Sequence, residues 1–156
     1  MTRLVACLLV AAGLALPGTA DAEQRCRVQA QALLFGDYTA GTESPVDSTS
    51  RVAVRCVGSP ASPFVVKLGT GTSGDPGNRE MRAGAESLSY NLYVDASRTT
   101  VWGDGTRGSE TVAVTAASDR GARPREADLA VYGRIHARQD PAPGLYTDAI
   151  VVTVEF

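Results

Sequence analysis

The sequence predicts an all-β protein, an antiparallel β-sandwich of seven or eight short strands. Apolar and polar residues alternate with a period of two along most of the chain, and no segment keeps a helical period for three turns. Clusters of Gly, Pro and Asp separate the alternating segments, as expected for tight turns between strands. A chain of this length forms one domain with a workable core.

In the first half of the chain, strands are expected at 27–34, 50–57, 63–68 and 87–95. The first of these places Val28, Ala30, Ala32 and Leu34 on one face. The second places Val52, Val54 and Cys56 on one face in the same way. The third is a short apolar run, and the turn-rich stretch 69–78 ends it.

In the second half, strands are expected at 99–102, 110–115, 128–137 and 145–156. The last of them carries an apolar face that continues to the final residue, formed by Ile150, Val152, Val154 and Phe156. A long apolar strand at the edge of a sheet promotes aggregation unless something covers it. We therefore expect another strand to cover this face.

The first 22 residues predict a signal peptide. Arg3 precedes the uncharged apolar run 4–16, which is too short to span a bilayer comfortably. The small-x-small pattern 20–22 then predicts cleavage after Ala22, so the mature domain is expected at 23–156. We predict an exported chain with no transmembrane segment after cleavage.

Two cysteines, Cys26 and Cys56, remain in the predicted mature chain. An even pair in an oxidising compartment most simply forms one disulfide. Closing a loop of about 30 residues stabilises the fold by roughly 3–4 kcal/mol through the unfolded state. A metal site would need more ligands than these, and His136 is the only histidine. No metal or other cofactor is expected.

Composition and motifs argue against catalysis and nucleic-acid binding. The net charge is −2, and no basic stripe is present. His136 lies in an alternating segment, without a G-x-S-x-G elbow, and the Gly-rich 69–77 lacks the lysine of a phosphate loop. Two alternatives stay open: a calcium site built from turn aspartates, and Trp102 as a platform for a sugar. An enzyme is not expected.

The order of several short motifs resembles the spore coat protein U domain, the pilin-type domain of archaic (Csu-like) chaperone–usher pili. The resemblance covers nearly all of 26–156, and the order and spacing of the motifs carry it rather than any one motif. The motif residues are Cys26, Phe35-Gly36-Asp37-Tyr38, Cys56, Leu68, Arg79, Met81, Tyr90-Asn91-Leu92-Tyr93, Asp95, Trp102-Gly103-Asp104-Gly105, Tyr132-Gly133-Arg134-Ile135, Gln139, Gly144, Tyr146 and Asp148.

This resemblance implies an immunoglobulin-like sandwich that lacks one strand and has a hydrophobic groove between its first and last strands. A donor strand from another protein would fill the groove. The implied partners are a periplasmic pilus chaperone, an outer-membrane usher, and a neighbouring pilin that donates its N-terminal strand. The implied setting is the periplasm during assembly and then the cell surface, in adhesion and biofilm formation.

The chain departs from this family pattern ahead of Cys26. A donor strand needs about ten residues, roughly 33 Å. The predicted mature chain has only three polar residues there, 23–25. The sequence thus predicts a subunit that accepts a strand without donating one, which fits a tip or terminal minor subunit. The alternatives are a self-contained secreted coat or carbohydrate-binding sandwich, and a shaft subunit whose start is misassigned.

Overall fold

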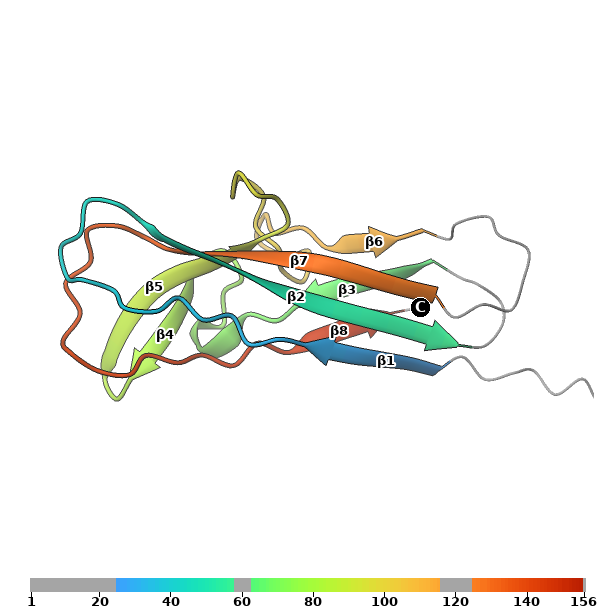
Figure 1. Cartoon of the computed structure of the whole chain (residues 1–156), viewed down its shortest axis with the longest axis horizontal. Helices are drawn as coiled ribbons and strands as arrows, with labels where there is room; N and C mark the ends of the chain where they lie inside the picture. Colours follow the sequence, from blue (N-terminus) through green and yellow to red (C-terminus); the bar gives the residue numbers. More distant parts are fainter. Residues whose placement is uncertain (1–24, 58–62, 116–124, 156) are drawn as a thin grey trace, which may run out of the picture.

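The computed structural model describes residues 25–57, 63–115 and 125–155, so the predicted signal peptide and Phe156 lie outside the described residues. The described chain is nearly all β-structure and is elongated (Figure 1). Its elements are β1 Arg25–Ala30, β2 Val46–Val57, β3 Phe64–Leu68, the 3-10 helix η1 Gly71–Ser73, β4 Arg79–Ala83, β5 Glu86–Tyr93, β6 Val112–Val114, β7 Arg125–Ile135 and β8 Val152–Glu155.

The strands form two antiparallel sheets that pack face to face. The larger sheet has the order β1-β2-β7-β5-β4, and the smaller has the order β6-β3-β8. Buried side chains of both sheets share one hydrophobic core, as in an immunoglobulin-like sandwich. The predicted fold class is therefore confirmed. β1 and β8 are edge strands of different sheets, and they lie close to each other (Figure 1).

The disulfide between Cys26 and Cys56 is present, as predicted. The two cysteines lie directly opposite each other in the antiparallel register of β1 and β2. Cys56 is 4% exposed, and Cys26 packs against the core. The bridge fastens the first strand to the larger sheet at the end where that strand begins.

Trp102 belongs to the centre of the core. Its side chain is fully buried, and its indole Nε1 donates a hydrogen bond to the carbonyl oxygen of Val66 at 3.1 Å. This bond satisfies the polar end of the ring, as a buried Trp requires. The alternative of an exposed sugar platform at Trp102 is therefore wrong.

The turn aspartates stabilise their own turns. Asp75, Asp95 and Asp104 each accept hydrogen bonds from backbone N–H groups two to five residues further along the chain. Hydrogen bonds from Ser97, Thr100 and Thr99 lower the pKa of Asp95 well below its usual value. Among the described residues, no three Asp, Glu, His or Cys side chains are grouped to hold a metal ion.

Several strands differ in extent from the predicted ones. β4 was not predicted. Its inward side chains are Arg79 and Met81, and a charged residue at an inward position breaks the apolar alternation that predicts a strand. The segment 99–102 supplies only isolated bridges at Val101 and Trp102. The first predicted strand ends at Ala30 in the structure, and the last begins only at Val152. The sandwich is therefore irregular along parts of two predicted strands.

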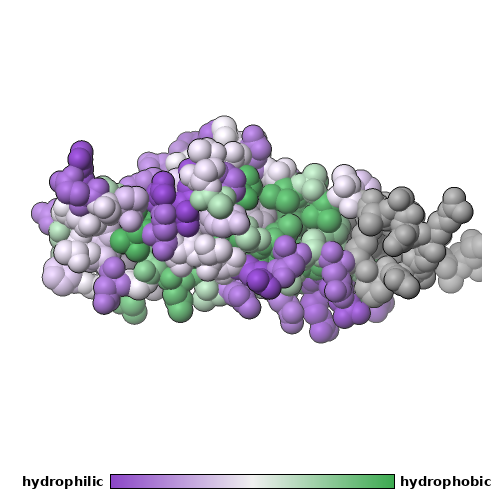
Figure 2. All heavy atoms as spheres, turned by 45° about the horizontal axis from the view of Figure 1, so that its top comes forward, coloured by the Kyte–Doolittle hydropathy of each residue, from purple (hydrophilic) through white to green (hydrophobic). Residues whose placement is uncertain are grey.

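The side of the molecule on which β6 lies has a mainly polar surface, with apolar side chains reaching the surface between polar ones (Figure 2). Val112 and Val114 of β6 are partly buried and pack against the core. Among the described residues, no helix is long and apolar enough to cross a membrane.

Candidate functional site: an apolar groove between two sheet edges

An apolar groove of about 610 Å³ opens between the edge of the larger sheet and the edge of the smaller one. Its first wall is 30–35, which continues β1, and its second wall is 145–152, which leads into β8. Figure 1 shows these two segments running side by side along one long side of the molecule. The floor consists of Ser50, Val52, Leu68, Met81, Tyr90, Leu92 and Val131.

The first wall stays attached to β2 through serine side chains after the regular ladder ends. Ser50 Oγ donates to the carbonyl oxygen of Gln31 at 2.7 Å, and Ser48 Oγ donates to that of Leu34 at 2.6 Å. The N–H of Gln31 also donates to the carbonyl oxygen of Arg51. These bonds hold the wall along β2.

The predicted inward face of the first strand is found only as far as Ala30. Val28 and Ala30 lie opposite the buried Val54 and Val52 and therefore point to the core side. Both are nevertheless exposed, Val28 at 37%, because no described strand covers this face. The core side of β1 is thus open to solvent at Val28 and Ala30.

Beyond Ala30 the positions that face the core shift by one residue. Leu33 and Phe35 are partly buried and pack against the core, whereas Leu34 is 78% exposed. Ala32 and Leu34 line the groove and are exposed. The expected single face of Val28, Ala30, Ala32 and Leu34 is therefore not continuous. Sequence alternation missed Leu33 and Phe35 as core-packing residues because the wall leaves the regular strand geometry.

The second wall is hydrogen-bonded to the smaller sheet and to β4. The backbone of Thr147 exchanges two hydrogen bonds with that of Arg82, at 2.8 and 3.1 Å. The carbonyl oxygen of Val151 accepts a hydrogen bond from the N–H of Gly69 at 2.8 Å. These contacts hold the second wall to β4 and to the residue that follows β3.

The predicted inward face of the final strand is found for its described residues. Ile150, Val152 and Val154 are partly buried and pack against the core. Ile150 and Val152 also line the groove. Phe156 lies outside the described residues.

Both walls present backbone groups that lack partners. Within the described residues, no hydrogen bond reaches the backbone N–H or C=O groups of Ala32, Leu33, Phe35, Tyr146, Asp148 or Ile150. Backbone groups become costly to leave unpaired once they are buried away from water. The groove therefore combines an apolar floor with two rows of free main-chain donors and acceptors.

Asp148 fixes the second wall to the groove floor. Its Oδ2 accepts a hydrogen bond from Tyr90 Oη at 2.8 Å, and its Oδ1 accepts from the N–H and Oγ1 of Thr72 at 2.9 and 2.7 Å. A Cβ on Gly71 would meet Asp148 Oδ2 at 2.1 Å, so only glycine fits there. Burial and the Asp148 carboxylate raise the pKa of Tyr90, which therefore stays a neutral donor.

A family model of the spore coat protein U domain matches residues 14–153. This match covers most of the chain. The chain belongs to the spore coat protein U domain family.

Among solved structures, this spore coat U domain is similar to a chain in a crystal structure of a chaperone–tip adhesion subunit pre-assembly complex, CsuC–CsuE, from the archaic chaperone–usher Csu pili of Acinetobacter baumannii. The TM-score is 0.57 and the sequence identity is 26%. The similarity covers 86% of this chain and 40% of the other, so the domain spans less than half the length of that chain. No curated protein sequence matches the chain.

In this spore coat U domain, the motif Tyr132-Gly133-Arg134 supports the first wall. A Cβ on Gly133 would lie 2.8 Å from both Leu33 Cδ1 and Phe35 Cζ, so the two side chains need glycine beneath them. The ring of Phe35 packs edge-to-face on Tyr90, with centroids 5.9 Å apart. Motif residues far apart in the sequence thus build one end of the groove.

A second group of motif residues forms a buried polar cluster beside the groove. Arg79 is 0% exposed, and its guanidinium donates to the carbonyl oxygens of Leu68, Gly69, Pro76 and Trp102 and to Asn91 Oδ1, at 2.7 to 3.3 Å. Asn91 in turn donates to the carbonyl oxygen of Gly77. Among the described residues, no buried side-chain nitrogen or oxygen lacks a hydrogen-bond partner. The Arg79 cluster therefore ties three loops to β4 and β5.

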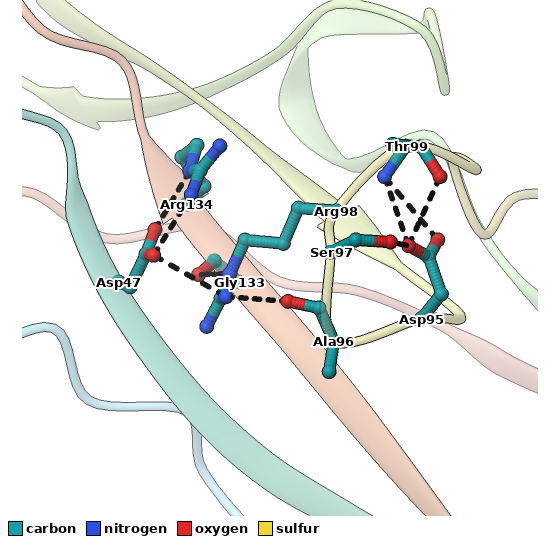
Figure 3. Close-up of polar contacts among 8 residues, drawn as sticks. All are labelled: Asp47, Asp95, Ala96, Ser97, Arg98, Thr99, Gly133 and Arg134. Carbon is teal, nitrogen blue, oxygen red and sulfur yellow. Dashed lines mark hydrogen bonds and ion pairs between the residues drawn. The ribbon is translucent and has the colours of Figure 1, made fainter.

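The outer face of the larger sheet carries an ionic cluster, shown in Figure 3. Arg134 makes two hydrogen bonds to the carboxylate of Asp47, at 2.7 and 2.9 Å, and Arg98 contacts the same carboxylate at 3.2 Å. The hydrogen bonds and charge of Arg134 and the charge of Arg98 lower the pKa of Asp47. Arg98 also donates to the carbonyl oxygen of Gly133 and lies over the ring of Tyr132. The cluster fastens the turn after β5 to β2 and β7.

Proposed function

We propose that this protein is a non-catalytic structural subunit of an archaic chaperone–usher pilus, and that its groove accepts a donor β-strand from another subunit. The observation that carries the proposal is the open core face beside β1. The inward-pointing Val28 and Ala30 are exposed, and free backbone groups line both walls of the same groove. A strand inserted there would cover the apolar face and pair both rows of backbone groups.

The dimensions of the groove suit a short strand. The first wall, 30–35, has six residues, and an extended segment of that length spans about 20 Å. Such a segment would point about three side chains inward, each contributing roughly 1.5–3 kcal/mol when fully buried. Main-chain hydrogen bonds would add affinity that does not depend on the donor sequence.

Family membership and the similar structure support the proposed order of partners. That structure holds a chaperone with a pilus subunit before assembly. By analogy, a periplasmic chaperone would occupy the groove of this subunit first. The N-terminal donor strand of a neighbouring pilin would then replace the chaperone at an outer-membrane usher, and the subunit would end on the cell surface.

The finer proposal is that this subunit stands at the tip or another terminal position of the fibre. It depends on cleavage after Ala22, which would leave only residues 23–25 ahead of Cys26. The subunit in the similar complex is itself described as a tip adhesion subunit. N-terminal sequencing of the exported protein tests the proposal. A start well before residue 23 would favour a shaft subunit.

The proposed function is tested by thermal unfolding of the exported chain, alone and with a peptide copied from the N-terminal extension of the major pilin of the same system. We expect a large rise in melting temperature and a 1:1 complex in native mass spectrometry. The matched control is a peptide of the same composition in scrambled order, which should leave the melting temperature unchanged. A high melting temperature that neither peptide moves would instead indicate a self-contained secreted coat or carbohydrate-binding sandwich.

A further inference from the structure

A group of arginine side chains lies on the outer face of the larger sheet, at the end where β1 begins. β1 and β2 turn Cys26, Val54 and Cys56 toward the core, so the residues between them point outward. The exposed outward residues include four arginines, Arg25, Arg27, Arg51 and Arg55. The sequence hides this group, because the antiparallel register of β1 and β2 brings together two segments that are distant in the chain. We call the group the arginine strip.

Two arginines of the strip stand directly opposite each other. Arg27 of β1 is the register partner of Arg55 of β2. Side chains in such positions have Cβ atoms about 4.5–5.5 Å apart, and like charges there destabilise a sheet. Among the residues that the structure describes, no hydrogen bond or ion pair engages the side chain of Arg27. The repulsion between the two guanidinium groups is therefore relieved on the side of Arg55 alone.

The acidic neighbours of the strip lie on β7. Arg55 Nε lies 3.2 Å from Glu126 Oε1, and Arg51 Nη1 lies 2.8 Å from Asp128 Oδ2. These four side chains are 54% to 65% exposed, so their ion pairs are weak and can share a guanidinium with another anion. The strip and its two acidic neighbours carry four positive and two negative charges, in a chain whose net charge is −2. Positive charge is thus concentrated on this face.

The shape of the strip suits one extended chain. Neighbouring strands lie about 4.8 Å apart, and residues two apart along a strand are separated by about 7 Å. Ala53 lies between Arg51 and Arg55 along β2, opposite the exposed Gln29 of β1. The Ala53 side chain ends at Cβ and leaves room between two guanidinium groups. The amide of Gln29 can donate to and accept from hydroxyl groups.

We propose that the arginine strip binds the carboxylate groups of an extended acidic polysaccharide. A guanidinium binds a carboxylate through two parallel hydrogen bonds, and a carboxylate between Arg27 and Arg55 would also remove their repulsion. Sugar hydroxyl groups would contact Gln29. A nucleic-acid duplex fits this face less well, because even one small module buries about 600–1,000 Å² of protein surface on DNA. Such a footprint would bring phosphates against the two carboxylates of β7.

This site is separate from the groove. The strip points away from the core, whereas the groove is lined by core-side residues such as Val52 and Val131. A strand in the groove would leave the strip exposed, so the inference does not rest on the proposed function. The disulfide between Cys26 and Cys56 fastens together the two strands that carry the arginines. The strip is therefore displayed on a rigid part of the fold.

Isothermal titration calorimetry of the exported chain with an oligogalacturonate of about ten sugars tests the proposal. We expect binding in about 50 mM NaCl that weakens roughly tenfold or more in about 500 mM NaCl, because salt screens charges on an exposed face. Dextran, an uncharged polysaccharide, should not bind at either salt concentration.

The variants Arg27→Gln and Arg55→Gln each remove one charge from the strip. Each should weaken oligogalacturonate binding by about fivefold or more, because a charge-assisted hydrogen-bond pair is lost. The matched control is Arg138→Gln, which removes the same charge from a side chain that is 75% exposed beyond the end of β7. The control should leave the affinity unchanged.

Thermal unfolding separates a binding role from a structural one. Arg27→Gln should raise the melting temperature of the free chain by about 1–4 °C, because it removes a repulsion between opposed charges. Oligogalacturonate should raise the melting temperature of the wild type more than that of Arg27→Gln. A lower melting temperature for free Arg27→Gln would overturn the proposal, because the arginine would then serve stability.

Further outcomes would also overturn the proposal. One is the absence of oligogalacturonate binding at low salt, and another is equal affinity for the wild type and both strip variants. Tighter binding of a DNA duplex of about 20 base pairs would assign the strip to nucleic acid instead. Tighter binding of phosphatidylglycerol vesicles would assign it to an anionic membrane. All of these outcomes leave the proposed function of the groove intact.

Discussion

Two neighbouring regions of the sandwich differ in whether their polar groups have hydrogen-bond partners. Around Arg79, a charged side chain and several loop carbonyls are fully buried, and each guanidinium nitrogen has a partner. In the groove, apolar side chains face solvent, and several backbone groups of both walls have no hydrogen-bond partner among the described residues. Gly69 links the two regions, because its carbonyl accepts from Arg79 while its N–H donates to the second wall.

This contrast separates the part of the fold whose polar groups are paired from the part whose apolar face and unpaired backbone groups are open to solvent. A closed polar network in a low-dielectric core strongly specifies one arrangement of its loops. The groove lies next to that network, and Gly69 joins the network to the second wall. The difference suggests that stability and binding can be changed separately by substitutions in the two regions.

The largest effect is expected from Arg79→Met, which keeps much of the side-chain volume and removes the guanidinium. Several buried carbonyl oxygens would lose their donor, and the free energy of unfolding should fall by about 3–5 kcal/mol. Urea unfolding followed by tryptophan fluorescence measures this change, since Trp102 adjoins the cluster. A loss below about 1 kcal/mol would contradict the assigned role of the cluster.

Removal of the disulfide should have the next largest effect. The double variant Cys26→Ser, Cys56→Ser frees a loop of about 30 residues and should lower stability by roughly 2–4 kcal/mol. The first wall should also become more mobile, because β1 leads directly into it. Thermal unfolding of the wild type with and without a reductant gives an independent check, and equal melting temperatures would argue against this contribution.

Gly133→Ala should lower the stability of the fold and weaken peptide binding at the same time. The added Cβ would press on Leu33 and Phe35, so the first wall must shift at a cost of about 1–3 kcal/mol. Peptide binding should weaken at the same time, because the wall forms one side of the groove. The matched control is Gly36→Ala: nothing lies near that Cβ, so its positive φ alone should lower stability without a contact-driven shift of the wall.

The smallest effect is expected from Asp47→Asn on the outer face. Because Arg134 and Arg98 lower the pKa of Asp47 in the folded state, the carboxylate stabilises the fold above its unfolded pKa, near 3.9. That contribution is lost as the pH falls through the lowered folded pKa. The side chain is about one-third exposed, so solvent screening limits the loss to about 0.5–1 kcal/mol.

Urea unfolding at pH 7 and pH 3 tests this prediction. The difference between the wild type and Asp47→Asn should shrink at the lower pH. A difference that stays constant or grows would show that the ion pair is not its source. Peptide binding should be unchanged, since Asp47 does not line the groove.

Alternation in the sequence was sufficient to predict the sandwich, because regular strands repeat every two residues. The disulfide was predicted separately, from the even pair of cysteines in an exported chain. Alternation failed at the first wall, where hydrogen bonds from serine side chains replace those of the backbone ladder. There Leu33 and Phe35 pack against the core instead of Leu34. It also missed β4, since no local pattern shows that Arg79 is buried. That burial depends on carbonyl oxygens from 68–76 and 102, which only the tertiary fold brings together.

Backbone amide hydrogen exchange of the exported chain, with and without the major-pilin peptide, tests the central contrast most directly. Without peptide, amides around Arg79 and on β5 should exchange slowly, whereas those of Ala32, Leu33, Tyr146 and Ile150 should exchange fast. The peptide should protect the amides of both walls and leave those near Arg79 unchanged. Slow exchange along both walls without any peptide would contradict the account, because it would mean that the groove is already closed.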